Sequence, residues 1–178
     1  GEDVISTMDY LEVLNGSESS MFQDKLDMSN IGVVGHSTGG GGVVYAAMND
    51  ARIDVLIGLD AWVEPLGYEA LEEGLSIPAV FLRSESWEVG YNNDYLYALL
   101  DQSDATLYQV NGTTHFDFAM VYMYSPLVKT FGFTGEHDGE YLNLMLETVI
   151  LDMVETSLID SETSFDDYSE IFDAFVEI

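Results

Sequence analysis

The segment from Ile31 to Met48 constrains the fold more than any other part of the chain. An apolar run at 31–34 leads into a Gly-x-Ser-x-Gly turn at 35–39, and a stretch rich in Val and Ala follows. Glycines two residues before and after a serine let a strand and a helix approach without Cβ clashes. The pattern alone recurs by chance, but a buried strand before it and an apolar helix after it are the context of a nucleophile elbow. The segment predicts strand, sharp turn and helix, with Ser37 as a candidate nucleophile in a strained conformation.

The composition fits one globular domain. The chain has 178 residues, of which 47% are hydrophobic, enough to bury a core and to exclude general disorder. It contains no cysteine, which excludes disulfides and thiolate metal sites. No run reaches the roughly 18 apolar residues of a transmembrane helix, and no signal peptide is visible. Secretion and the cytoplasm of a salt-adapted organism both stay open as locations.

The charge is strongly negative. Thirty-three acidic residues face only 4 basic ones, a formal net charge of −29. Such a surface repels nucleic acid and anionic lipid headgroups, so we expect neither as an electrostatic partner. Mutual repulsion is screened at high salt, where the Debye length falls to about 3 Å at 1 M. Salt adaptation and simple solubility are two open interpretations of this acidity.

Helical and strand patterns alternate along the chain. Helical spacing of apolar residues predicts helices over 4–14, 39–49, 91–101 and 141–158, and apolar runs predict strands over 31–34, 55–59, 79–82 and 106–110. This alternation indicates an α/β fold with a mainly parallel sheet flanked by helices. We divide the chain into a main part, 1–160, and an acidic amphipathic tail, 161–178. The aromatic spacing of the tail predicts a terminal helix with Phe165, Tyr168, Phe172 and Phe175 on it.

A serine nucleophile needs a base, and the chain has three histidines. His115 follows a predicted strand, at the carboxyl end of the sheet where the crevice of an open α/β fold lies. We therefore assign the base to His115. His36 adjoins the serine and is expected to pack or to line the crevice, and His137 is expected in a solvated loop.

Two carboxylates are candidates for the acid that orients the base. Asp60 and Glu85 each end a predicted strand, and both satisfy the chain order serine, acid, histidine. A carboxylate buried behind an apolar strand needs a hydrogen-bonding partner, which suits Asp60. Glu85 has Arg83 nearby as a surface partner. The residues favour Asp60 and leave Glu85 as the alternative.

Five segments carry a resemblance to a known family. They are Gly35-His-Ser-Thr-Gly-Gly, Asp50-Ala-Arg-Ile, Leu59-Asp-Ala-Trp-Val-Glu-Pro-Leu-Gly67, Ile77-Pro-Ala-Val-Phe-Leu-Arg-Ser-Glu85 and Gly112-Thr-Thr-His-Phe-Asp-Phe118. Together they resemble the plasma type of platelet-activating factor acetylhydrolase, over residues 28–118 and more weakly to about 158. The resemblance implies the α/β-hydrolase fold and a catalytic triad of Ser37, Asp60 and His115, and its Leu-Asp-Ala-Trp segment favours Asp60 over Glu85.

The expected activity is that of a serine esterase on a lipid or short-acyl ester, which proceeds through an acyl-enzyme. The backbone N–H of Thr38 is an expected oxyanion donor, because it follows the nucleophile. We expect an apolar substrate pocket near His36, Trp62, Leu66 and Phe116. No metal constellation is apparent in the sequence, and the reaction needs no cofactor.

In an α/β-hydrolase the elbow follows the fifth strand, whereas only residues 1–30 precede the elbow strand here. We therefore expect the C-terminal part of such a domain, with the missing N-terminal half or another chain covering the sheet edge and supplying the second oxyanion donor.

Two alternative functions stay open. One is that of a cutinase-like polyester hydrolase with its acid near Glu85, suggested by the glycine run 39–42. The other is a non-catalytic processed half or subunit.

Overall fold

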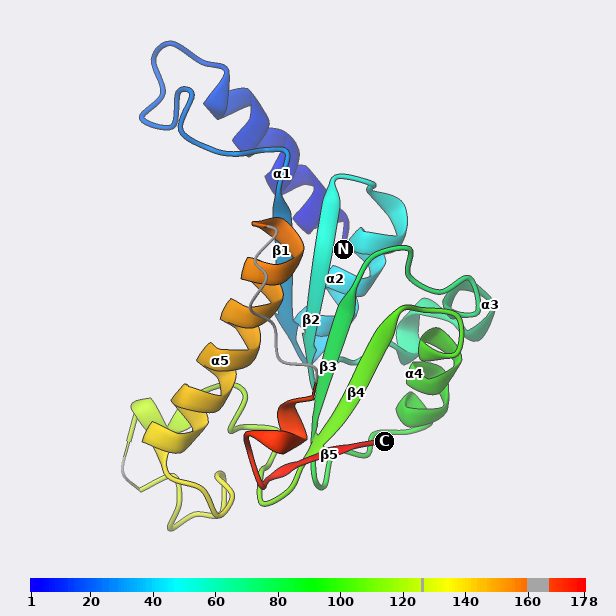
Figure 1. Ribbon diagram of the computed structural model, residues 1–178, viewed down its shortest axis with the longest axis vertical. Helices are drawn as coiled ribbons and strands as arrows, with labels where there is room; N and C mark the ends of the chain where they lie inside the picture. The colour runs from blue at the N-terminus through cyan, green and yellow to red at the C-terminus, as the bar shows by residue number, and fades with distance from the viewer. Residues whose placement is uncertain (126, 160–166) are drawn as a thin grey trace.

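A five-stranded sheet lies between two layers of helices in the computed structural model, which describes residues 1–125, 127–159 and 167–178 (Figure 1). The strands lie in chain order: β1 (Ile31–His36), β2 (Ile53–Leu59), β3 (Ala79–Ser84), β4 (Ala105–Val110) and β5 (Phe175–Glu177). The first four are parallel, and β5 pairs antiparallel with β4. The predicted mainly parallel sheet flanked by helices is confirmed, and its four predicted strands lie where the apolar runs place them.

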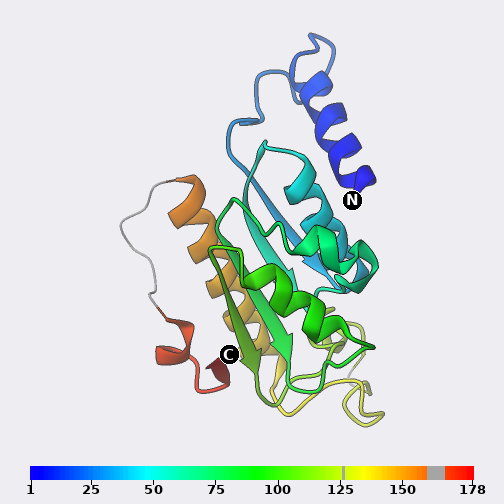
Figure 2. The ribbon, with the colours of Figure 1, turned by 90° about the vertical axis from the view of Figure 1, so that its right-hand side faces the viewer.

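Helices cover both faces of the sheet. On one face lie α2 (Thr38–Asn49), α3 (Tyr68–Leu71) and α4 (Asn92–Leu100), and on the other lies α5 (Gly139–Leu158) (Figures 1 and 2). Short 3₁₀ turns lie at η1 (Glu64–Leu66) and η2 (Val121–Met123). Side chains of a strand alternate between the faces, so Phe81 joins the core under α2 and α4 while Leu82 joins the core under α5.

The first helix lies at one end of the molecule. Helix α1 (Glu2–Asn15) packs beside α2, and its only buried residue is Met8. Arg52 joins it to the body through ion pairs with Asp9 (2.6 Å) and Glu12 (3.1 Å). Figures 1 and 2 show α1 and the loop after it extending past the end of the sheet. None of the helices within the described ranges has the length and apolarity to cross a membrane.

The expected terminal helix is wrong for the described part of the tail. Residues 167–178 form the 3₁₀ turn η3 (Tyr168–Glu170) and the strand β5 instead. Phe172 and Phe175 are buried in the core under α5, while Ile178 N–H donates to Leu107 O at 3.0 Å. The edge of β4 offers unpaired backbone groups, and pairing with them outweighs the helical spacing of the aromatics. Phe165 lies outside the described residues.

Candidate active site

Ser37 occupies the sharp turn between β1 and α2. Its backbone has φ 56° and ψ −123°, a region that non-glycine residues rarely enter. A Cβ at Gly35 would overlap the backbone of Gly39, so the turn requires glycine at that position. Ser37 N–H donates to Leu59 O (3.0 Å), and Ser37 O accepts from Trp62 N–H (2.9 Å). The connection after β2 thus fixes the strained turn.

Asp60 follows the last residue of β2 and is 1% exposed. Its carboxylate accepts two hydrogen bonds of 2.6 Å from Ser84, from the backbone N–H to Oδ1 and from the hydroxyl to Oδ2. Burial raises the pKa of Asp60, and the hydrogen bonds from Ser84 and His115 oppose that rise. Ser84 therefore supplies the partner that a buried carboxylate needs.

His115 lies between Asp60 and Ser37. Its Nδ1 is 3.0 Å from Asp60 Oδ2, and its Nε2 is 3.0 Å from Ser37 Oγ. An ionised carboxylate only accepts hydrogen bonds, so Nδ1 carries the proton of the neutral ring and Nε2 accepts from the serine hydroxyl. The structure thus joins the three residues expected as catalytic in one hydrogen-bonded chain at the carboxyl ends of β1, β2 and β4.

The loop that carries His115 is tied down on both sides. Asp117 is 1% exposed, and its Oδ2 accepts N–H groups from Thr114 (2.7 Å) and Gly135 (2.9 Å). Gly112 N–H donates to Glu85 Oε2 at 2.7 Å. Glu85 therefore bonds the backbone before His115, whereas Asp60 bonds the imidazole itself.

The other two histidines take different places. His36 Nε2 donates to the carbonyl oxygen of His115 at 3.0 Å, and the two ring centroids are 4.4 Å apart. Burial, and after it the charge of His115, lowers the pKa of His36. His137 is half-buried rather than solvated as expected: its Nε2 bonds Asn111 O at 2.8 Å, and its ring stacks on Tyr141. The hydrogen bond to the carbonyl oxygen of Asn111, directly after β4, holds the His137 ring against the body of the protein.

Sequence reasoning missed two neighbours of the candidate triad. Ser84 holds Asp60, and Trp87 stacks on the ring of His115 with centroids 3.7 Å apart and planes 6° apart. Both follow the apolar core of β3, at the same sheet edge as Asp60. Polar and aromatic residues at the carboxyl end of a strand next to the acid were the signal that could have pointed to them.

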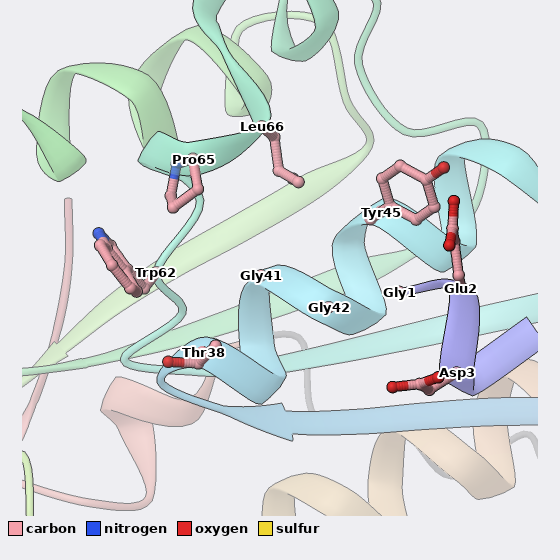
Figure 3. Close-up of a pocket in the computed structure, with 10 residues that line it drawn as sticks. All are labelled: Gly1, Glu2, Asp3, Thr38, Gly41, Gly42, Tyr45, Trp62, Pro65 and Leu66. Carbon is pink, nitrogen blue, oxygen red and sulfur yellow. The ribbon is translucent and has the colours of Figure 1, made fainter.

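A cavity of about 440 Å³ opens beside the elbow (Figure 3). Its lining residues come from the start of α1, from α2 and from the connection after β2: Gly1, Glu2, Asp3, Thr38, Gly41, Gly42, Tyr45, Trp62, Pro65 and Leu66. In Figure 3 the glycine face of α2 lies between Trp62 and Thr38 on one side and the carboxylates of α1 on the other. Trp62 and Leu66, two of the residues expected near a substrate pocket, line this cavity. His36 and Phe116 do not line this cavity, because their rings lie against His115.

The start of α2 borders the cavity beside the elbow, because Thr38 is one of the residues that line it. The first amides of a helix lack partners in their own helix, and the helix dipole makes that end positive. Thr38 is the first residue of α2, so its N–H belongs to that group. One donor for an anion therefore lies directly after Ser37.

The donor set of a metal site is also present. One ligand atom each from His36, Asp60 and His115 lies within 4.8 Å of the others. The hydrogen bond between Asp60 and His115, and that from His36 to the His115 carbonyl, account for this proximity.

Comparisons with known proteins show which family the sequence matches. Residues 7–171 match a family described as platelet-activating factor acetylhydrolase, isoform II. The platelet-activating factor acetylhydrolase of Gallus gallus is 31% identical over 90 residues, which are 50% of this chain and 21% of that protein. The one from Canis lupus familiaris is 31% identical over 98 residues, 54% of this chain and 22% of that protein. These matches span about a fifth of the relatives' length.

A solved structure shares the architecture. A ferulic acid esterase from Streptomyces cinnamoneus superposes with a TM-score of 0.72 at 19% identity, covering 99% of this chain and 55% of that one. At this identity the likeness concerns the fold alone. It confirms the expected α/β-hydrolase fold.

Proposed function

This chain belongs to the platelet-activating factor acetylhydrolase family, isoform II, and on that premise we propose that it hydrolyses carboxylic esters through Ser37, His115 and Asp60. The observation that carries the proposal is the unbroken hydrogen-bonded chain from Ser37 Oγ through the imidazole to the Asp60 carboxylate. Each of its two contacts measures 3.0 Å, within the reach that proton transfer needs. The family match supports the same chemistry.

The proposed reaction has two halves. Ser37 Oγ attacks the ester carbonyl while His115 Nε2 takes the hydroxyl proton and then gives it to the leaving alcohol. Water then attacks the acyl-enzyme while His115 Nε2 takes a proton from it, and the transfer of that proton to Ser37 Oγ releases the acid and restores the serine. Asp60 holds the Nδ1–H tautomer and stabilises the imidazolium formed in each half.

The tetrahedral intermediates carry a negative charge on the former carbonyl oxygen. The Thr38 N–H at the positive end of α2 is the proposed oxyanion donor. Loss of one donor from such a site costs roughly 10²–10³ in rate. We propose that a second donor comes from another segment, or another chain, that packs against the β1 edge.

The proposed substrate is a lipid or short-acyl ester. Two observations support an apolar acyl group. Trp62 and Leu66 form the apolar wall of the cavity beside Thr38. Beyond His115, large apolar side chains are exposed on the segment that follows it: Phe116, Met123, Tyr124, Leu127, Phe131 and Phe133. Such a surface suits a substrate with a long apolar portion.

Replacement of Ser37 tests the proposal. In high-salt buffer, Ser37→Ala should abolish hydrolysis of p-nitrophenyl acetate, while Ser86→Ala, at an exposed position in the loop after β3, keeps it. A phosphonate ester should label Ser37 in the wild type and leave Ser37→Ala unlabelled. Undiminished hydrolysis by Ser37→Ala contradicts the assignment.

One observation favours a second candidate, a non-catalytic subunit that associates with another chain. Within the described residues β1 pairs only with β2, so its other edge offers unpaired backbone groups, a common site of strand addition. Val34 of this strand is 43% exposed. A copurifying second polypeptide in native mass measurements, together with a preparation inert toward esters and phosphonates, supports this candidate over the esterase.

A further inference from the structure

Trp87 is the one inward-facing residue of an exposed loop. The loop connects β3 to α4, and residues 85, 86, 88, 89 and 90 are all exposed, whereas Trp87 is half-buried. Its backbone N–H donates to Ser84 O at 3.1 Å, so a tight turn joins Trp87 to the residue that holds Asp60. Its Nε1 is buried without a hydrogen bond, so the position of the indole depends on packing.

The packing partner is the imidazole of His115. With centroids 3.7 Å apart and planes 6° apart, the indole covers one whole face of that ring. His36 is 4.4 Å away with its plane tilted by 36°, and its ring cannot share the face that the indole occupies. The two ring nitrogens of His115 point to Asp60 and Ser37, so His36 lies on the opposite face. The imidazole is thus held between two rings.

We propose that Trp87 is a positioning residue for His115, which keeps the imidazole aimed at Ser37 and stabilises its protonated form through its π face. The inference rests on the esterase function proposed above. Charge on His115 appears in each half of the reaction, and a cation over an indole face is stabilised by the ring quadrupole, most strongly where water is excluded. Trp87 therefore favours the state that the transition state resembles.

The other groups around His115 do not replace this contact. Asp60 faces it at Nδ1, and the neutral His36 ring lies on the other face. The carboxylate of Glu85 is bonded to Gly112 N–H, and that of Asp117 to Thr114 N–H. Phe116 touches the ring only at its edge, with centroids 5.9 Å apart.

Fluorescence tests the contact without any substrate. A protonated imidazole quenches an indole stacked on it, and the chain has only two tryptophans. The difference in emission between the wild type and Trp87→Phe isolates Trp87 from Trp62. This difference should fall on acidification with the same midpoint as the acid limb of kcat/KM, and His115→Gln should remove the fall. A Trp87 signal that does not respond to pH in the wild type overturns the stack.

Kinetics test the effect on catalysis. Trp87→Leu keeps an apolar cover but loses the π face, so kcat should fall about three- to tenfold, the size of one cation–π contact. The acid limb of kcat/KM should move to lower pH by about half a unit, because a less stabilised imidazolium loses its proton more readily. Trp87→Phe should recover most of both. Tyr91→Leu, at an exposed aromatic near the end of the same loop, is the matched control.

Two failures are distinguishable. If Trp87→Leu matches Tyr91→Leu in rate and pH profile, the role of Trp87 is overturned while the esterase stands. If Ser37→Ala retains full hydrolysis, the proposed function fails, and the quenching measurement still decides whether the indole senses the charge of His115.

Discussion

Ser84 donates both its backbone N–H and its hydroxyl to the two carboxylate oxygens of Asp60, each at 2.6 Å. The strand neighbours fix this contact, because Leu59 of β2 pairs with Leu82 of β3, and Asp60, directly after β2, therefore lies beside Ser84, the last residue of β3. Ser84 is fully buried. The acid of the proposed triad is therefore held from the neighbouring strand as well as by its own.

Loss of the Ser84 hydroxyl should weaken catalysis. Burial raises the pKa of Asp60, and the hydrogen bonds that Ser84 donates oppose that rise; one such bond to a charged group contributes about 1.5–3 kcal/mol. Ser84→Ala should lower kcat/KM roughly tenfold and move its acid limb to higher pH. Ser86→Ala is the control, and an unchanged pH profile in Ser84→Ala contradicts the prediction.

Asp60→Asn should cost far more activity than Glu85→Gln. Asn does not hold the Nδ1–H tautomer of His115 as a carboxylate does. Therefore kcat should fall by about 10³–10⁴. Glu85→Gln keeps an oxygen for the Gly112 amide and should stay within about threefold. The two rates are compared with p-nitrophenyl acetate. The reverse order would favour the polyester-hydrolase alternative with its acid near Glu85.

Two glycines of α2 should respond oppositely to alanine. A Cβ at Gly41 would overlap Trp62 O, whereas a Cβ at Gly39 meets no atom within 4 Å. Gly41→Ala should lower the free energy of unfolding by about 1–3 kcal/mol or more, and Gly39→Ala should raise it by about 0.5–1 kcal/mol. Urea unfolding measures both. Equal effects would mean that α2 does not pack against the connection after β2 as described.

Protonation of His36 should destabilise the fold. Its pKa is lowered by burial and by the nearby charge of His115, so the unfolded chain binds a proton where the folded protein does not. The free energy of unfolding then falls as the pH drops below the ordinary histidine value of 6.5. Gln in place of His36 keeps an N–H for the His115 carbonyl without titrating. Urea unfolding at pH 7 and 5.5 should show a smaller loss for His36→Gln, and equal losses contradict the assignment.

Salt should stabilise the protein, as the salt-adapted interpretation predicts. With a formal net charge of −29, repulsion opposes the compact state, and about 1 M salt shortens the Debye length to roughly 3 Å. The Tm followed by circular dichroism should rise between about 0.1 M and 2 M NaCl, because the added salt screens the repulsion. A Tm that ignores NaCl would leave simple solubility as the reason for the acidity.

The sequence by itself determined the local elements and the order of the candidate site. Apolar runs and helical spacing act within short segments, so the four parallel strands and the elbow at Ser37 could be located from them. Chain order and the Leu-Asp-Ala-Trp segment pointed to Asp60 and His115, which lie 55 residues apart and yet in hydrogen-bonding contact.

Only the tertiary structure decided what surrounds these residues. The parallel register aligns His36 with Leu59 and Leu59 with Leu82, and this alignment brings Ser84 to Asp60 and Trp87 to His115. The same kind of long-range pairing places β5, in the described part of the tail, on β4 in place of the expected helix. Such contacts depend on the position of one strand against another, and no periodicity within a single segment records that position.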